Sequence, residues 1–245
     1  MSADLNALRH LLKERFPSAA PLVQRTVAPV STGLSELDRI LPGRGLPRGK
    51  LTAWGPLGGA SAVLRAACQR VVVAGERAVW VDAERTIGAE WQEGPLLIRP
   101  QDPLPRINAL RAAEVVLASG GFALVVLSAG ADPEGTERVR LTRAAREGNC
   151  AFVALTESPS LATLRVSSRI LPHSFRWARG PFADPAAPID ATVEIRVRTL
   201  GWNAHASVVL PVDPYELRLS LDPSLVDRRG GERARTGTRR GARSR

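Results

Sequence analysis

Short apolar runs alternate with helical patterns between residues 50 and 156. The runs have the length of strands and lie at 50–54, 78–84, 96–98, 122–128 and 150–156. Between them, apolar residues recur at helical spacing from residue 60 onward and over 105–119 and 136–147. Such alternation of strands and helices favours a parallel sheet with helices on both faces. We therefore expect an α/β fold with a mostly parallel sheet.

The pattern changes towards the C-terminus, where strict alternation replaces the longer apolar runs. Apolar residues at 193, 195 and 197 alternate with charged residues at 194, 196 and 198. This pattern predicts a strand with one buried and one solvated face, paired through a turn at 200–203 with a second strand at 204–210. Further short segments lie at 166–171 and 215–221. We expect antiparallel strands on this side of the sheet.

Two helices are expected before the first strand. Residues 4–16 place four apolar side chains on one helical stripe, and these are Leu5, Leu8, Leu12 and Phe16. This helix either folds back on its own domain or packs on a partner or a second copy, because a helix this short is marginal alone. Ser35 and Asp38 match a capping box for the second helix. The predicted organisation is helix and linker at 1–29, core at 30–225 and tail at 226–245.

The net charge of +10 is concentrated at the C-terminal end of the 245 residues. Residues 228–245 contain eight arginines and one acidic residue, which account for +7, and the arginines include Arg228, Arg229, Arg233 and Arg235. This composition predicts a disordered tail. The apolar fraction of 44% is ordinary for a globular core, and no apolar run reaches membrane-spanning length. Cys68 and Cys150 are expected to be buried thiols.

A glycine-rich turn lies between the first predicted strand and its helix. Phosphate-binding loops of the pattern G-x-x-x-x-G-K-[ST] occupy such junctions; the lysine neutralises phosphate charge and the hydroxyl binds Mg²⁺. The turn here reads Gly55, Pro56, Leu57, Gly58, Gly59, Ala60, Ser61 and Ala62. Ala60 replaces the second glycine, Ser61 the lysine and Ala62 the final hydroxyl residue. We therefore expect a nucleotide-binding fold that has lost its nucleotide chemistry and holds no cofactor.

The residues around this turn resemble the RecA recombinase family. Residues 31–41 read Ser-Thr-Gly-Leu-Ser-Glu-Leu-Asp-Arg-Ile-Leu and precede a Gly-Leu-Pro turn, as the core of that family does. The family's water-activating glutamate falls on Glu84, which ends an Asp-Ala-Glu sequence. Its magnesium-organising Walker B aspartate falls on Leu127. The resemblance implies a RecA-like core in which Glu84 is a relic, or simply a surface or core-capping glutamate, and ATP is not hydrolysed.

RecA proteins also carry two mobile DNA-binding loops in the second half of this core. The resemblance places the corresponding segments near 157–165 and 174–188. The second of these interleaves arginine with aromatic residues, as single-strand binders do. The candidate DNA contacts are Arg165, Arg169, Arg176, Trp177 and Arg179. The alternative interpretation is a surface hairpin with Trp177 packed into the core.

Among RecA relatives, the chain resembles the ImuA family in its size, its degraded P-loop and its lack of the large C-terminal domain of the recombinases. ImuA proteins are accessory proteins of the mutasome, which performs translesion DNA synthesis in the SOS response. The resemblance implies a cytoplasmic, non-catalytic adaptor. Its partners would be an ImuB-like inactive Y-family polymerase and a DnaE-type error-prone polymerase, with RecA as a further candidate.

Two other functions remain open from the sequence. The first is a basic module for single-stranded DNA, and the second is a weak RecA-type ATPase. Residues 60–62 and Leu127 argue against the second, because they remove the lysine and both magnesium contacts. The histidines His10, His173 and His205 are far apart in the sequence, so we expect no metal site.

Overall fold

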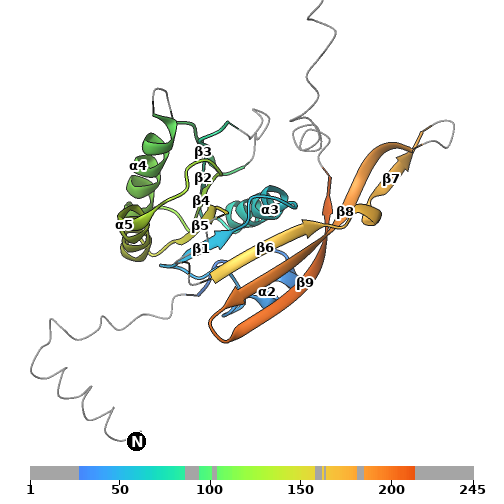
Figure 1. Cartoon of the computed structure of the whole chain (residues 1–245), viewed down its shortest axis with the longest axis horizontal. Helices are drawn as coiled ribbons and strands as arrows, with labels where there is room; N and C mark the ends of the chain where they lie inside the picture. Colours follow the sequence, from blue (N-terminus) through green and yellow to red (C-terminus); the bar gives the residue numbers. More distant parts are fainter. Residues whose placement is uncertain are drawn as a thin grey trace, which may run out of the picture.

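The computed structural model of the chain describes residues 28–85, 94–100, 104–157, 162, 164–180 and 185–212. These residues form one nine-stranded sheet with helices packed against it (Figure 1). In chain order the elements are α2 (Ser35–Ile40), β1 (Leu51–Trp54), α3 (Ala60–Val73), β2 (Ala78–Val81), β3 (Leu96–Ile98), α4 (Pro105–Ala118), β4 (Leu124–Leu127), α5 (Gly135–Glu147), β5 (Ala151–Leu155), β6 (Leu164–Ile170), η1 (Pro172–Ser174), β7 (Arg176–Arg179), β8 (Pro185–Thr199) and β9 (Trp202–Pro211).

The sheet has the predicted parallel part. Its strand order is β3-β2-β4-β5-β1-β6-β8-β7, and β9 also pairs with β8. β1 lies between β5 and β6 and is parallel to both, with Leu51 opposite Phe152 and Ala53 opposite Arg165. Every residue of β1, β2, β4 and β5 is buried. Burial on both faces explains why these strands are continuous apolar runs in the sequence.

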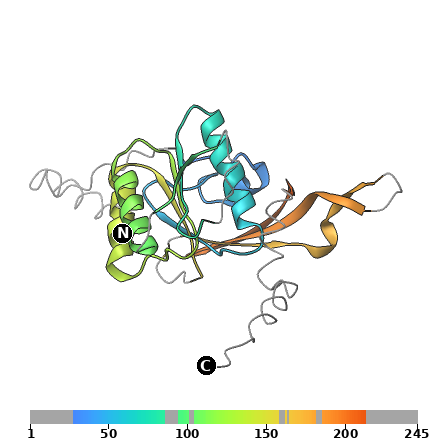
Figure 2. The ribbon, with the colours of Figure 1, turned by 90° about the horizontal axis from the view of Figure 1, so that it is seen from above.

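The predicted antiparallel part is also present. β8 pairs with β6, with β7 and, from Asp190 to Thr199, with β9. Val193, Ile195 and Val197 are buried, so the alternation in the sequence predicted the buried face of this strand correctly. The part of β8 that pairs with β7 extends beyond the rest of the sheet as a hairpin (Figures 1 and 2).

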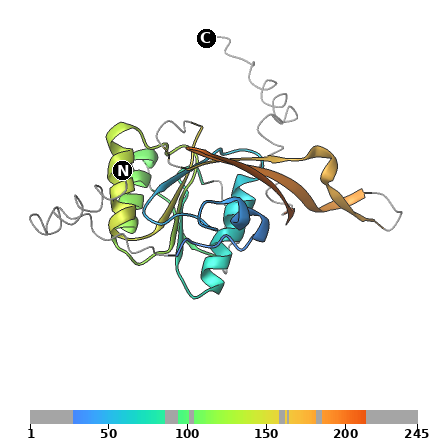
Figure 3. The ribbon, with the colours of Figure 1, turned by 90° about the horizontal axis from the view of Figure 1, so that it is seen from below.

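The two faces of the sheet are covered differently. α2 and α3 lie on one face (Figure 3), and their apolar side chains form a core with residues of both the parallel and the antiparallel strands. α4 and α5 form a second core on the other face, and its strand residues come from β1, β2, β4 and β5. Ala53 of β1 is paired with Arg165 of β6, so Arg165 lies on the same face of the sheet as this second core. On β6, however, that face presents an exposed arginine and not an apolar side chain.

The helix expected near residue 35 is present, but the predicted capping box is wrong. α2 begins at Ser35 itself, and no side chain caps its N-terminus. The carboxylate of Asp38 instead accepts hydrogen bonds from the backbone N–H of Thr32 (2.9 Å) and from its hydroxyl (2.7 Å). Asp38 therefore fixes the turn before the helix, while the hydroxyl of Ser35 donates a hydrogen bond to Glu36 Oε2 at 2.9 Å.

Several predictions fall on residues that the structure does not describe. These are the helix at 4–16, the strand at 215–221 and the tail at 226–245. Cys68 and Cys150 are buried free thiols, as expected, and burial raises the pKa of Cys150 to about 11. None of the described helices is long and apolar enough to cross a membrane.

Candidate nucleotide site at the first strand–helix turn

The glycine-rich turn connects β1 to α3 as the sequence predicts. Gly58 and Gly59 have φ values of 71° and 85°, in the left-handed region that favours glycine. Gly59 is the N-cap of α3, so the first free N–H groups of that helix face the turn. The two glycines therefore allow the sharp turn by which the backbone passes from β1 into α3.

The turn is fastened to β6 by hydrogen bonds and by close packing. The N–H of Gly55 donates to the carbonyl of Val166 at 2.9 Å. The hydroxyl of Ser168 accepts from Trp54 Nε1 and donates to the Leu57 carbonyl, both at 3.2 Å. A Cβ added to Gly58 would lie 2.1 Å from the Ser168 carbonyl oxygen. The glycine at 58 thus allows two backbones to touch.

The positions that would hold Mg-ATP carry no suitable group. Ala60 is buried and its side chain belongs to the core that α2 and α3 form with the sheet. Ala62 is partly buried against the same core, and Ser61 has no positive charge. Leu57, at the tip of the turn, is 74% exposed. Within the described turn, Gly55 to Ala62, the group that would attract an anion is the N-terminus of α3.

The residue that the RecA resemblance assigns to the Walker B aspartate belongs to the core. Leu127 ends β4, is fully buried in the core under α4 and α5, and lies opposite Val81 and Ala154 in the sheet. Next to it, the hydroxyl of Ser128 accepts a hydrogen bond from the N–H of Ala83 at 2.9 Å. An apolar side chain in this place supplies no magnesium ligand.

Glu84 lies just beyond β2 and is exposed. Its carboxylate lies over Gly130, where an added Cβ would come within 2.2 Å of Oε1. Sequence reasoning did not single out Asp82, two residues earlier, which is fully buried and whose Oδ2 lies 3.9 Å from Arg99 Nε. The described residues contain no cluster of three or more histidine, cysteine or acidic residues that could hold a metal ion.

The candidate DNA contacts do not lie on two loops, as the resemblance had implied. Arg165 and Arg169 belong to β6, and Arg176 to Arg179 form β7, which pairs with β8. The loop prediction is therefore wrong for Arg165 and for Arg176–Arg179, because pairing with neighbouring strands holds their backbones in the sheet. Residues 158–161, 163 and 181–184 lie outside the described residues.

The hairpin interpretation of this segment is correct, but Trp177 is not packed into the core. Its side chain is 49% exposed and lies with its ring centre 6.2 Å from that of Phe175. Arg176 forms an ion pair with Asp190, and this hydrogen-bonded guanidinium lowers the pKa of the Asp190 carboxyl. The charge of Arg176, one of the candidate DNA contacts, is thus already neutralised by Asp190.

The fold and the position of this turn define the class of the protein, which has a RecA-like α/β fold. No protein-family model and no curated protein matches the chain. Among solved structures, the chain is similar to the crystal structure of the RadB recombinase, with a TM-score of 0.50 and 17% sequence identity. The similarity covers 75% of this chain and 100% of that chain. At this identity it establishes the fold alone.

Proposed function

We propose that the chain is a non-catalytic RecA-fold accessory protein that works by binding other proteins. The observation that carries the proposal is the replacement of the lysine, of the magnesium-binding hydroxyl and of the Walker B carboxylate, although the glutamate at Glu84 is present. Ser61 and Ala62 stand where lysine and a magnesium-binding hydroxyl are needed, and Leu127 stands where a carboxylate is needed.

Packing supports this interpretation independently of the residue types. Leu127 contributes to the core under α4 and α5, and Ala60 to the core under α2 and α3. Both side chains stabilise the fold through burial, at about 0.8 kcal/mol for each buried methylene group. Recovering magnesium binding would require a carboxylate in an apolar core, which is costly without a metal or a cation beside it.

The accessory role that we propose is in translesion DNA synthesis, in the manner of the ImuA family. Its partners would be an ImuB-like inactive polymerase of the Y family and a DnaE-type error-prone polymerase. RecA is a further proposed target, since a RecA-fold subunit that docks without ATP would weaken a filament held together through nucleotide. The proposed contact is the apolar stripe of Leu5, Leu8, Leu12 and Phe16.

The first test is Mg-ATP binding by titration calorimetry, with phosphate release followed in parallel. We expect neither heat of binding nor turnover at millimolar nucleotide. Turnover would contradict the proposal outright. Binding without turnover would contradict the loss of the site and would show that a nucleotide-dependent switch remains.

The second test is co-purification of the full chain with each proposed partner, compared with a Leu8→Asp/Leu12→Asp variant. We expect complex formation by the natural chain and its loss in the variant. A Val115→Asp/Val139→Asp variant makes the same chemical change at two exposed apolar positions on α4 and α5. Equal loss in both variants, or no complex with any partner, would contradict the proposed contact.

A further inference from the structure

Among the described residues the sheet has three edge strands, β3, β7 and β9, and two of them are protected against pairing with a further strand. β3 has only three residues. β7 carries Arg176 and Arg179, its register with β8 is interrupted, and two prolines of β8 lie opposite it. Short length, charge, irregular register and proline are the devices by which proteins prevent the unwanted addition of a strand to an edge.

The third edge strand, β9, has none of these devices along its length. It runs for ten residues, Trp202–Pro211, in continuous register with β8. Its sequence, WNAHASVVLP, contains no arginine, lysine, aspartate or glutamate, and its one proline is the last residue. No other strand in the described part of the chain pairs with it. A long, uncharged edge of this kind is a template for another strand.

The backbone groups that face the free edge of β9 follow from its register. The N–H of Val212 donates to the Ile189 carbonyl at 2.9 Å, so the backbone of Val212 is directed towards β8. In an antiparallel pair, successive residues direct their N–H and C=O groups alternately towards the partner strand and away from it. The residues whose groups point away from β8 are therefore Asn203, His205, Ser207 and Val209.

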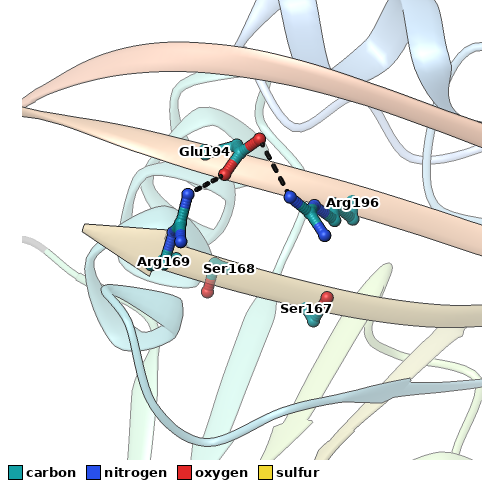
Figure 4. Close-up of a pocket in the computed structure, with 5 residues that line it drawn as sticks. All are labelled: Ser167, Ser168, Arg169, Glu194 and Arg196. Carbon is teal, nitrogen blue, oxygen red and sulfur yellow. Dashed lines mark hydrogen bonds and ion pairs between the residues drawn. The ribbon is translucent and has the colours of Figure 1, made fainter. Parts of the chain in front are cut away.

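The charged side chains of this part of the sheet lie one and two strands inward from the edge. Glu194 of β8 accepts hydrogen bonds from Arg169 of β6 at 2.8 Å and from Arg196 at 3.4 Å (Figure 4). If two copies of the chain paired through β9, their β8 strands would be three strand spacings apart, about 14 Å. This distance exceeds the Debye length of about 8 Å at physiological ionic strength, so repulsion between the two sets of arginines is largely screened.

The side chains of β9 are complementary to those of a second β9 strand. Pairing keeps the buried side chains of both copies on one face only if the two-fold axis passes through a residue and not between two. With the axis at Ala206, Ala204 lies opposite Val208 of the second copy, and Trp202 lies opposite its Leu210. Small side chains thus meet larger ones, and Trp202, which is 49% exposed, gains an apolar neighbour.

The same register uses all the backbone groups at the free edge. Asn203 lies opposite Val209 of the second copy and His205 lies opposite its Ser207, and the two-fold axis repeats both pairs. Each of these opposed pairs exchanges two hydrogen bonds, so the contact would contain about eight. An ordinary protein–protein interface contains about ten direct hydrogen bonds. The edge therefore supplies nearly as many hydrogen bonds as a typical interface has.

We propose that two copies of the chain associate through antiparallel pairing of their β9 strands, which joins the two sheets into one. The contact is distinct from the glycine-rich turn and from the apolar stripe of residues 4–16. The proposal goes beyond the proposed accessory function and does not depend on it. The absence of charge from β9 and its match in side-chain size with itself favour a second copy over a segment of another protein.

The test is sedimentation equilibrium of the full chain and of a Ser207→Pro/Val209→Lys variant over a wide range of protein concentration. The natural chain should be a dimer. In the variant, the dissociation constant should rise by about a hundredfold, because symmetry removes an edge N–H and adds a positive charge in both halves of the contact. Neither residue directs its backbone towards β8, so the pairing of β8 with β9 is retained.

Two control variants separate the edge from other contacts. Val115→Lys makes the same change at an exposed valine of α4, and Leu8→Asp/Leu12→Asp changes the apolar stripe. Both should remain dimeric. Val209→Lys alone replaces the double variant if the proline prevents folding, and it should also weaken the dimer.

Three results of these measurements would overturn the proposal. The first is a natural chain that is monomeric at every concentration; if the edge variant then loses binding of another protein, the edge belongs to that partner. The second is an edge variant that dimerises as tightly as the natural chain. The third is loss of the dimer in Leu8→Asp/Leu12→Asp while the edge variant remains dimeric.

Hydrogen exchange of the natural chain, measured by NMR, provides a readout that needs no variant. In a monomer, the amides of Asn203, His205, Ser207 and Val209 should exchange rapidly, whereas those of the residues between them are protected by β8. In the dimer both sets should be protected, and the first set should lose its protection on dilution. A dimer in which these four amides exchange rapidly would place the contact elsewhere and would overturn the proposal.

Discussion

One face of the sheet is covered by helices over its parallel half and open over its antiparallel half. On the covered half, Leu51 and Phe152 are paired in register beneath α4 and α5. On the open half, the same face carries Arg165 and Arg198 in register. The two halves share a continuous hydrogen-bonded sheet, so the difference lies in what packs on them and not in the backbone.

The loss of nucleotide chemistry that we propose is compatible with this contrast, because it leaves the fold intact. Leu127 and Ala60, at the positions that the RecA resemblance assigns to ligand-binding groups, are apolar and belong to the two cores. A charged position on an open face has no core beside it into which an apolar replacement could pack. At Arg165 and Arg198 the charge has no ion-pair partner among the residues that the structure describes, so it has to be accommodated by solvent or by another molecule.

The largest effect should come from Phe152→Ala in the covered half. Phe152 is fully buried in the core under α4 and α5, and its truncation should lower the free energy of unfolding by about 3–5 kcal/mol. Arg196→Ala changes the same face in the open half and should cost less than about 0.5 kcal/mol. Guanidinium denaturation measures both. If Phe152→Ala and Arg196→Ala lowered the free energy of unfolding by similar amounts, the contrast between a covered and an open half would be wrong.

Gly58→Ala tests the boundary between the halves, where the turn touches β6. Both this residue and Gly75 have positive φ, and a Cβ at Gly75 meets no atom within 4 Å. Gly75→Ala should therefore cost only the backbone strain, about 1 kcal/mol. Gly58→Ala adds a collision with the Ser168 carbonyl and should cost about 2 kcal/mol more. Equal costs in urea denaturation would contradict close contact between the turn and β6.

Ser168→Ala should cost about 1–3 kcal/mol, because it leaves the buried Trp54 Nε1 without its acceptor and the Leu57 carbonyl without its donor. The matched control is Ser167→Ala, since Ser167 projects from the exposed face of the same strand. This control should stay within about 0.5 kcal/mol. If the two serines cost the same, the hydrogen bonds to Ser168 do not fasten the turn.

The smallest effect concerns an ion pair between the helices of the covered half. The hydrogen bond from Arg106 lowers the pKa of Glu137, with further help from the N–H of Glu134 and from Arg140. Because the pKa is lower in the folded state, this stabilisation is present above the ordinary value of 4.5 and is lost as pH falls through the folded value.

Glu137→Gln should therefore destabilise the protein by about 0.5 kcal/mol at pH 7 and make little difference at pH 3. Denaturation at a series of pH values measures the gap, which is the difference in free energy of unfolding between the natural chain and the variant. The gap at pH 7 should also shrink in 1 M salt, which screens exposed charges. A gap that grows as the pH falls would contradict the assigned direction.

The strands and helices of the core could be predicted from sequence because their signals are local. Residues 96–98 and the start of α3 at Ala60 match the structure, since apolar runs and glycines mark them directly. The glycine-rich turn and its missing lysine were visible for the same reason. The buried face of β8 followed from its period of two.

Features that depend on contacts between distant residues could not be predicted in this way. The role of Ser168 requires a partner 114 positions earlier. The opposition of Arg165 and Arg198 requires the register of two strands, although the alternation of charges along each strand was a partial signal. The sequence analysis paired Asp38 with Ser35, but its partner is Thr32. Both hydroxyl residues lie within a few positions of Asp38, so spacing alone did not distinguish them.

The bond from Trp54 to Ser168 also has a consequence for the order of folding. Contacts between residues so far apart in the chain form late, because closing a long loop costs entropy before the contact returns any energy. The glycine-rich turn therefore acquires its final shape only after β6 has joined β1. A nascent chain that has emerged only as far as β5 has the sequence of the turn but not its geometry, so no ligand of the turn can guide the early steps of folding.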